Sequence, residues 1–419
     1  MRAPLLALLL LLVAGCATPG GGDAPGPAPS AGGASRFLAP QDLGPGGPEP
    51  VVVFSPEGDR IYVAAQDPNG GAPRVFISKD GGATFSSHRV TTDVTGGGEV
   101  DIAAGPAGMV YVTQLGPRGN IVSVSRDRGE TWQTAPLGGA SQYFDREWLA
   151  VDAQGRVYVV AREFGAAGQG ESSGVARSDD RGLTFPPRGR AWSSLDEPGI
   201  ANGPLVAVGN AVHLVYVCRD GNAVCLSTSR DGGLTWAQTL VAQRGVSAAN
   251  VYPAIAATGS GLLVAWSDAT DGALGVYVSR SSDGVSWSAP VKVSHAGGTS
   301  TLPWLAARGN TAWVVYLHAD GSFRATDCPA VAGAGWVPHA RELSSNGEPR
   351  GDAIALTALP VHRGIISPPV GVTCSGGARD RNFGDFFTAT VSPQGKLIVA
   401  VSADDGDPAS TRDLVIRER

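Results

Sequence analysis

The stretch Ser229-Arg230-Asp231-Gly232-Gly233-Leu234-Thr235-Trp236, SRDGGLTW in one-letter code, recurs along the chain. Related segments are SKDGGATF at 78–85, SRDRGETW at 125–132, SDDRGLTF at 178–185 and a longer form, SRSSDGVSW, at 279–287. Their aspartates, Asp80, Asp127, Asp180, Asp231 and Asp283, are separated by 47, 53, 51 and 52 residues. We call each segment a box. A regular period of about 50 residues indicates repeated copies of one supersecondary unit.

The residue types in a box predict a tight turn between two strands. The Asp side chain can accept hydrogen bonds from backbone N–H groups of the following residues. The glycine allows a positive φ, and the final Trp or Phe can bury a large apolar surface against a neighbouring unit. Apolar residues alternate before each box, as at 212–217, which is typical of a strand.

The five boxes resemble the Asp-box (bacterial neuraminidase) repeats of sialidase-like β-propellers. The resemblance covers nearly all of the chain from residue 36 onward. It implies an all-β propeller in which the boxes are structural turns that lie away from the active site. This fold carries many functions, so the activity has to be argued from the site.

Seven repeats can be counted. The innermost strands are expected at 50–55, 100–104, 148–152, 205–208, 253–257, 303–307 and 386–391. We expect Trp336 to end a degraded sixth box that has lost its Asp. The seventh repeat lacks a last strand, which Arg36–Ala39 can supply from the other terminus, leaving no open sheet edge. The prediction is seven four-stranded blades, or six if 303–369 forms one irregular blade.

The N-terminus has the pattern of an export signal. Met1-Arg2 precedes an apolar run from Leu5 to Val13 that is too short to cross a bilayer as a helix. The segment LVAGC, ending at Cys16, resembles a bacterial lipobox, which implies cleavage after residue 15 and lipidation of Cys16. An ordinary signal peptide is the alternative. Residues 16–35, rich in Gly, Ala and Pro, are expected to be a flexible tether to a propeller at 36–419.

The charge composition of the chain limits the classes of partner that it can bind. The net charge of −6 and the lack of a basic stripe argue against nucleic acid. We expect a monomer at the bacterial cell envelope, held by the lipid on Cys16 and, because Ala17 follows it, at the outer membrane.

Export permits disulfides. Cys218 and Cys225 flank a turn centred on Gly221-Asn222, and as directly opposite residues of a hairpin they can pair. Cys328 and Cys374 would then form the second bond. Zinc is the less favoured alternative, because no CxxC spacing is present.

Polar residues are dense at 143–147, just before the third innermost strand. In the sialidase resemblance, Tyr143 would be the nucleophile with Glu147 as its base, and Asp101 or Asp145 the acid. Arg146 and Arg381 would grip the substrate carboxylate. The alternative is that Asp145, Arg146 and Glu147 form structural ion pairs. The family's arginine of the first blade is missing, since Glu49-Pro50 stands there.

Asp404, Asp405 and Asp407 offer oxygen ligands for Ca²⁺, although such a cluster is also typical of a solvated turn. Two functions remain open. The first is a propeller that binds a glycan, or an envelope or extracellular protein, through its loops. The second is an exo-acting glycoside hydrolase of sialidase type.

Overall fold

The computed structural model describes residues 36–90, 98–116, 119–137, 144–164, 171–193, 199–219, 221–243, 252–270, 272–321, 334–364, 366, 383–404 and 410–419. These residues are almost entirely strand and turn. A short 3₁₀ turn, η1, spans Pro106–Gly108. No helix of the described chain is long and apolar enough to cross a bilayer.

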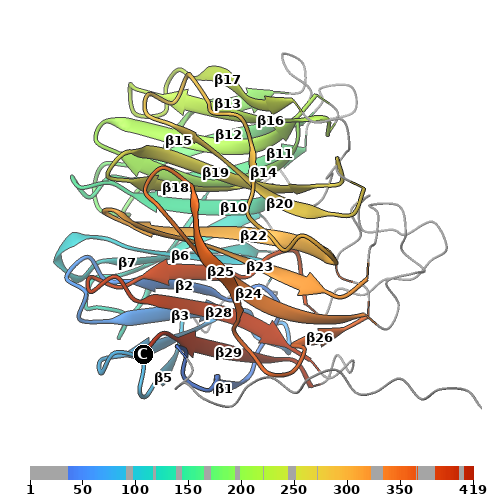
Figure 1. Ribbon diagram of the computed structural model, residues 1–419. Helices are drawn as coiled ribbons and strands as arrows, with labels where there is room; N and C mark the ends of the chain where they lie inside the picture. Colours follow the sequence, from blue (N-terminus) through green and yellow to red (C-terminus); the bar gives the residue numbers. More distant parts are fainter. Residues whose placement is uncertain are drawn as a thin grey trace, which may run out of the picture. The chain divides into compact units, whose positions relative to one another are not determined.

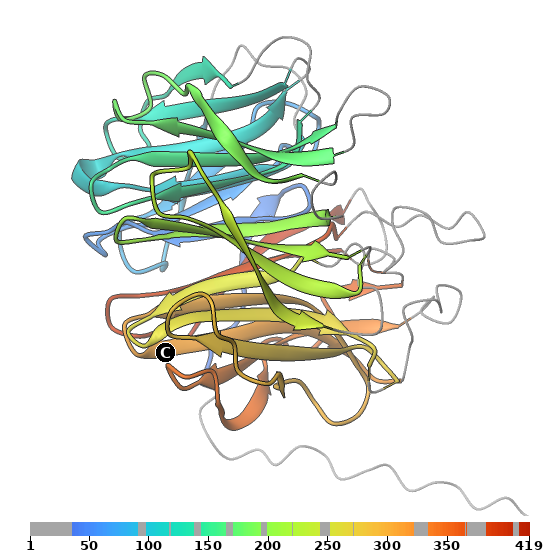
Figure 2. The same cartoon turned by 90° about the horizontal axis from the view of Figure 1, so that it is seen from above.

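The strands form seven antiparallel sheets that are the blades of a ring (Figures 1 and 2). From the innermost strand outward, blade one is β2 (Val51–Phe54), β3 (Ile61–Ala65), β4 (Arg74–Ser78) and β5 (Ser86–Arg89); blade two is β6 (Val100–Ala104), β7 (Val110–Gly116), β8 (Gly119–Ser125) and β9 (Gln133–Pro136); blade three is β10 (Phe144–Val151), β11 (Val157–Phe164), β12 (Glu171–Ser178) and β13 (Pro187–Ser193); blade four is β14 (Gly199–Val208), β15 (Ala211–Cys218), β16 (Ala223–Ser229) and β17 (Ala237–Gln243). Blade five is β18 (Ala254–Thr258), β19 (Gly261–Asp268), β20 (Gly275–Ser281) and β21 (Val291–Lys292); blade six is β22 (Thr299–Arg308), β23 (Thr311–Ala319), β24 (Gly335–Leu343) and β25 (Pro349–Ala355), with β26 (His362–Arg363) added to β24; blade seven is β27 (Thr388–Val391), β28 (Leu397–Ala403), β29 (Arg412–Arg417) and β1 (Gln41–Pro45). The predicted seven-bladed propeller is therefore confirmed, and the six-bladed alternative does not apply.

The two ends of the propeller differ. Each box follows the third strand of its blade, so the boxes lie at the end where the first strand turns into the second. In blade one, for example, Ser78 of the first box pairs with Ile61 at the start of β3. We call this end the box end and the opposite end the loop end.

The box around Asp231 shows the turn chemistry. Ser229 Oγ donates to Asp231 Oδ1 at 2.8 Å and accepts from the N–H of Gly233 at 2.8 Å. Thr235 donates its N–H to Asp231 Oδ1 at 3.0 Å and its hydroxyl to Oδ2. The same bonds recur at Asp80, Asp127 and Asp180. Hydrogen bonds from the Thr hydroxyl and N–H to the carboxylate hold the pKa of Asp231 below its usual range.

Blade six departs from the sequence prediction. Trp336 lies near the start of β24, at the loop end, where it is buried and donates Nε1–H to the carbonyl of Gly364 at 2.9 Å. The turn between β24 and β25 is instead formed around Ser344 and Gly347, without an aromatic residue. The expected sixth box at Trp336 was wrong, because an aromatic residue near the right spacing fits a strand as well as a turn.

The ring is closed by β1, which pairs antiparallel with β29 through Gln41↔Val415 and Pro45↔Arg412 (Figure 1). Closure by an N-terminal strand was predicted, but for Arg36–Ala39. Those residues supply only the bridge Phe37↔Glu418, since Phe37 is buried edge-on against Trp313 at 6.3 Å. The strand begins after Pro40, which has no N–H to donate to a ladder.

The predicted disulfide Cys218–Cys225 is present, with Cα atoms 5.9 Å apart. Its register differs from the prediction, because Tyr216 lies opposite Cys225 and Cys218 lies opposite Ala223. The cysteines are therefore diagonal neighbours on one face of the hairpin. The other three cysteines, Cys16, Cys328 and Cys374, lie outside the described residues.

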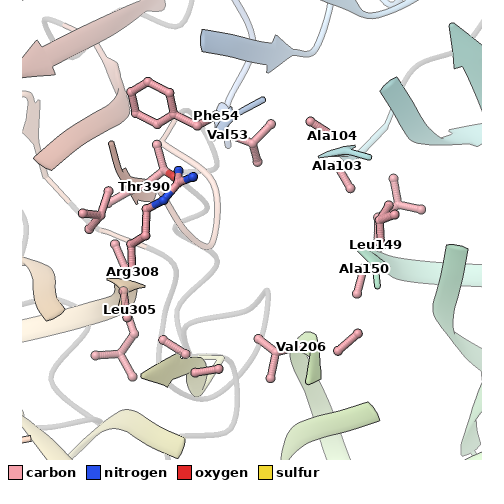
Figure 3. A pocket seen from close by; sticks show the side chains of 18 of the residues that line it. Val53, Phe54, Ala103, Ala104, Leu149, Ala150, Val206, Leu305, Arg308 and Thr390 are labelled. Atoms are coloured by element: carbon pink, nitrogen blue, oxygen red, sulfur yellow. The ribbon is translucent and has the colours of Figure 1, made fainter. Parts of the chain in front are cut away.

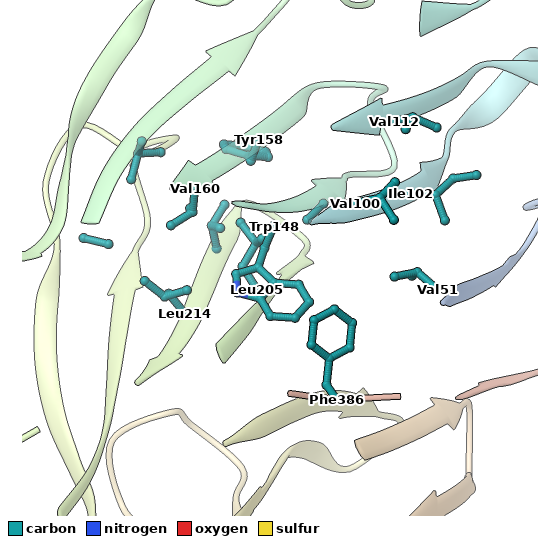
Figure 4. Packing of buried hydrophobic residues seen from close by; sticks show 14 of the residues in the cluster. Val51, Val100, Ile102, Val112, Trp148, Tyr158, Val160, Leu205, Leu214 and Phe386 are labelled. Atoms are coloured by element: carbon teal, nitrogen blue, oxygen red, sulfur yellow. The ribbon is translucent and has the colours of Figure 1, made fainter. Parts of the chain in front are cut away.

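The core lies between neighbouring blades and toward the axis. Figure 4 shows Trp148 of β10 beside Phe386, with Val51, Ile102 and Leu205 of other innermost strands around them. The ring centroids of Trp148 and Phe386 are 5.0 Å apart. Large side chains of the innermost strands thus pack against one another around the axis of the ring.

Candidate functional site

Polar residues form a ring at the loop end, close to the starts of five innermost strands. They are Glu49, Glu99, Tyr252 and Asp385, which stand shortly before their strands, and Arg146, which lies near the start of β10. Glu49 and Arg146 have positive φ values of 66° and 54°. At Arg146 the register of β10 against β11 also shifts, between Asp145 and Trp148. A bulge of this kind re-aims a side chain, and strained backbone of this kind often occurs at functional sites.

Arg146 is the centre of this ring and is only 3% exposed. Its Nη2 lies 2.8 Å from Glu99 Oε1 and 2.7 Å from Asp385 Oδ2, and its Nη1 lies 3.4 Å from Glu49 Oε2. Its backbone N–H also donates to Glu99 Oε2 at 2.7 Å. One guanidinium of blade three therefore joins carboxylates of blades one, two and seven.

The guanidinium rests on aromatic rings. Its Cζ lies 4.3 Å from the ring centroid of Tyr252 and 5.4 Å from that of Phe386. Trp148 lies 6.3 Å from Tyr252 and 5.7 Å from Trp304, so aromatic side chains of four blades pack below the charges. Cation–π contact adds to the ion pairs where water is excluded.

The ring has three carboxyl groups and one guanidinium, and burial acts on the pKa values of Glu99 and Arg146. Burial raises the pKa of Glu99 well above its ordinary value, against the opposing pull of Arg146. For Arg146, burial disfavours the charge, but Glu99, Glu49 and Asp385 outweigh it and the pKa is raised. Glu99, whose side chain is 17% exposed, is the one of these carboxylates that reaches furthest toward solvent.

Two of the predicted catalytic carboxyls lie beside the ring, toward blade two. Asp101 accepts backbone N–H bonds from Ile102 at 2.8 Å and from Leu149 at 2.6 Å, which ties β6 to β10. Burial raises the pKa of Asp101 to about 7 despite those bonds. Glu147 is buried, and its Oε2 accepts from Asn120 Nδ2 at 3.1 Å.

Glu147 differs from Asp101 in one respect. Burial raises the pKa of Glu147 to about 8, and among the described residues its Oε1 has no hydrogen-bond partner. The shift favours the protonated form of this carboxyl over the carboxylate. Asp145 lies opposite Arg162 in the β10–β11 ladder, outside the ring around Arg146.

The other predicted site residues are placed as follows. Tyr143 and Arg381 lie outside the described residues, as do Asp405 and Asp407. Asp404 is buried, and its carboxylate lies 2.9 Å from His362 Nδ1. Within the described ranges, no group of three or more His, Cys, Asp or Glu residues is placed to hold a metal ion.

Glu49, Glu99, Tyr252 and Asp385 were not part of the predicted catalytic set. A sequence signal for them exists, because each stands at or just before an innermost strand, in the same place as Arg146. Aligning the repeats on the prolines that start three of these strands, Pro50, Pro253 and Pro303, would bring Glu49, Tyr252 and Leu302 into one column.

A second polar cluster lies at the loop end between blades five and six. The ring centroids of His295 and His318 are 4.2 Å apart, and His339 is 4.6 Å from His295. Tyr316 Oη lies 3.2 Å from His295 Nδ1, and Ser300 Oγ lies 2.9 Å from His318 Nδ1. Burial lowers the pKa of all three imidazoles, that of His339 to about 4.

The box end of the channel is different in character. A cavity of about 480 Å³ opens there, lined mostly by apolar residues of the innermost strands (Figure 3). Leu149 and Leu305 line it, and each directly follows a tryptophan of the aromatic layer, Trp148 and Trp304. Arg308 lies at this cavity and donates to the carbonyl of Pro56 at 3.3 Å. The polar ring and the apolar cavity thus lie on opposite sides of the aromatic layer.

No protein-family model matches the chain, and no curated protein matches it. Solved structures do. A polysaccharide lyase named ulvan lyase, solved with a bound fragment containing GlcA, aligns over 92% of this chain and 96% of its own, at 13% identity and a TM-score of 0.54. A Hadza microbial sialidase aligns over 75% of this chain and 66% of its own, at 16% identity and a TM-score of 0.50. At such identities the likeness concerns the fold, which these glycan-active propellers share with this chain.

Proposed function

We propose that this chain is an envelope-anchored, sialidase-like propeller that binds a glycan through its loop end. The observation that carries the proposal is the ring around Arg146. Its guanidinium is already matched by Glu49, Glu99 and Asp385 over a layer of aromatic rings. Such a ring joins four blades and holds the loop end in one shape, which a binding face needs.

The described carboxyls favour binding over hydrolysis. A glycosidase needs two carboxyl groups, or a tyrosine with a carboxylate and an acid, facing each other across an open pocket. Asp101 is occupied by backbone N–H groups, and Glu49 and Asp385 by Arg146. To clamp an anionic sugar, Arg146 would have to give up carboxylates that it contacts in a water-excluded site.

The shared fold supports a glycan as the ligand, since the solved propellers named above include a sialidase and a polysaccharide lyase. A protein of the envelope or extracellular space is the other class of partner. The anchoring part of the proposal rests on the LVAGC segment and Cys16. A lipid on Cys16, joined by the tether 16–35, would hold the propeller at the bacterial outer membrane.

A sialidase-type glycoside hydrolase is the second candidate, and Glu147 favours it. A carboxyl whose pKa is raised to about 8 suits a general acid rather than the base that the sialidase resemblance assigns to Glu147. Among the described residues, Oε1 of Glu147 also has no hydrogen-bond partner. In this version Tyr143 is the nucleophile, and Arg381 binds the substrate carboxylate.

Two assays with residues 36–419 test these functions. A glycan array is expected to give saturable binding that survives Tyr143→Phe, and no binding to any glycan would contradict the proposal. Hydrolysis of a fluorogenic sialoside is expected to be absent. Turnover that is lost in Tyr143→Phe, Arg381→Ala and Glu147→Gln, with unchanged thermal unfolding, would establish the hydrolase instead.

A further inference from the structure

Exposed apolar side chains are concentrated on one part of the propeller. Seven large apolar side chains of the described chain are exposed: Leu183, Val208, Leu234, Leu240, Val285, Val291 and Leu359. All except Leu359 belong to blades three, four and five. Single exposed apolar residues need no explanation, but this gathering on three consecutive blades does.

Three of these side chains occupy the same place in consecutive boxes. Leu183, Leu234 and Val285 each follow the last box glycine, and they are 61%, 52% and 60% exposed. The turn does not need a large apolar residue there, because the first two boxes carry Ala83 and Glu130. They protrude from the box end rather than pack against the blade.

A polar contact and a groove connect the fourth box with the fifth. Arg230 of the fourth box donates to the carbonyl of Asp283 in the fifth at 3.2 Å. Val285 and Trp236 line a groove of about 280 Å³ between the two boxes. Each apolar tip also has an exposed arginine in its own box: Arg181, Arg230 and Arg280. Asp180, Asp231 and Asp283 accept hydrogen bonds within their turns, and Asp179 of the third box pairs with Arg177 and Arg188.

The described chain begins at this same end. Arg36 lies at the box end of blade seven, 2.7 Å from Glu418 and 3.0 Å from Glu342, with its guanidinium 4.5 Å from the Trp313 ring. Blade seven stands across the ring from blades three and four. Residues 16–35 precede Arg36 in the sequence.

We infer that the box end of blades three to five docks on a phospholipid surface. Leu183, Leu234 and Val285 would enter the interfacial region, and the neighbouring arginines would meet lipid phosphates. A lipid on Cys16 would add a second attachment, and the two together would keep the box end on the membrane. The loop end then faces away from the bilayer.

The inference rests on the anchoring part of the proposed function, and it is tested without the anchor. Residues 36–419 contain all seven blades and the closing strand, so this chain is mixed with vesicles of phosphatidylethanolamine and phosphatidylglycerol and sedimented. The wild type is expected to co-sediment. Leu183→Asp, Leu234→Asp and Val285→Asp are each expected to weaken partitioning roughly tenfold, as for one apolar side chain withdrawn from an apolar phase.

Leu359→Asp is the matched control. Leu359 is 73% exposed but follows β25 at the loop end, so this change should leave partitioning unaltered. Wild-type protein that stays in solution would overturn the inference, as would an equal loss in Leu359→Asp. Neither result would alter the glycan-array outcome, so a failure here is separate from a failure of glycan binding.

Discussion

At the scale of single residues, Arg146 makes the contacts that connect four blades at the loop end. Its positive φ and the bulge in β10 turn it out of the ladder toward carboxylates from three other blades. Buried ion pairs of this kind add little net stability, but losing one partner leaves charges without compensation. The ring therefore makes the ends of four blades depend on one another.

Replacing Arg146 with Met should lower the free energy of unfolding by about 3–5 kcal/mol, because Glu49, Glu99 and Asp385 lose their common cation. Urea unfolding measures the loss. It should shrink as the pH is lowered, since the buried carboxyls then take up protons. The control is Arg190→Ala, which removes the exposed ion pair of Arg190 with Glu163. This change should lower the free energy of unfolding by less than about 1 kcal/mol. Equal losses in the two variants would contradict the structural account.

The sequence predicted some of these residues and not their arrangement. Arg146 with its neighbours was proposed either as part of a catalytic set or as structural ion pairs, and the structure supplies three carboxylate partners. Their contacts with Arg146 could not be inferred from local sequence. Glu49 and Asp385 are 336 residues apart, yet Glu49 accepts the N–H of Asp385 at 2.7 Å, because the ring brings its first and last blades together.

At the scale of elements, strands β22 to β24 and the connection before them bring together His295, His318 and His339. The charged and titratable groups around these imidazoles are Arg341, Asp320 and the Tyr316 hydroxyl. Two protonated imidazoles at the 4.2 Å ring separation of His295 and His318 would repel each other by roughly 4 kcal/mol at the effective dielectric of a protein. The cluster is therefore stable when neutral.

Acid should weaken blade six through this cluster. Since the folded-state pKa of His339 is lowered to about 4, the unfolded chain binds the proton more readily. The contribution of neutral His339 to the free energy of unfolding is fully present above pH 6.5, the pKa of histidine in the unfolded chain. This contribution, up to ~3 kcal/mol, is lost as the pH falls toward the folded-state pKa of about 4. Thermal unfolding against pH measures this. His339→Gln should flatten the profile in that window, whereas His88→Gln in blade one should keep it.

The hairpin of β15 and β16 gives a separate prediction. The bond Cys218–Cys225 closes a loop with a sequence separation of 7. Its loss in the double variant Cys218→Ala and Cys225→Ala should reduce the free energy of unfolding by about 2 kcal/mol, mainly by freeing the unfolded chain. Urea unfolding of the variant beside the wild type measures the difference. A variant as stable as the wild type would show that the hairpin needs no cross-link.

The positions of the strands were predicted far better than the contacts between distant parts of the chain. Alternating apolar residues and the boxes located most of the innermost strands within a few residues, because both signals are local. The errors came where one residue type is typical of two structures, or where the structure depends on residues distant in the sequence. Trp336 suits a strand as well as a turn, and the closing strand is selected by the burial of Phe37 and the position of Pro40.

At the scale of the whole molecule, stability depends on closing the ring. Blade seven combines β27 to β29 from the C-terminus with β1 from the N-terminus. Pairing of β1 with β29 therefore joins the two ends of the described chain within one sheet. Phe37 secures this closure, since it is 3% exposed and packs on Trp313 in the core of blades six and seven.

Phe37→Ala should therefore lower the free energy of unfolding by about 3–5 kcal/mol, as for other buried aromatic residues. Its neighbour Arg36 is the comparison, because its ion pairs are partly exposed and Arg36→Ala should cost less than about 1 kcal/mol. Removing residues 36–45 altogether should expose the edge of β29 and produce dimers or larger species in size-exclusion chromatography. A monomeric truncated chain with unchanged unfolding would contradict the closing role.

The closing strand also has a mechanical consequence. β1 enters at the box end, beside Glu418, and runs along β29 toward the loop end. A pull on residue 36 that is directed away from the box end acts along β1. The hydrogen bonds of the β1–β29 pair then share the load instead of opening one after another, as they would if the strand were peeled sideways. A tether joined here loads the ring in its more resistant direction.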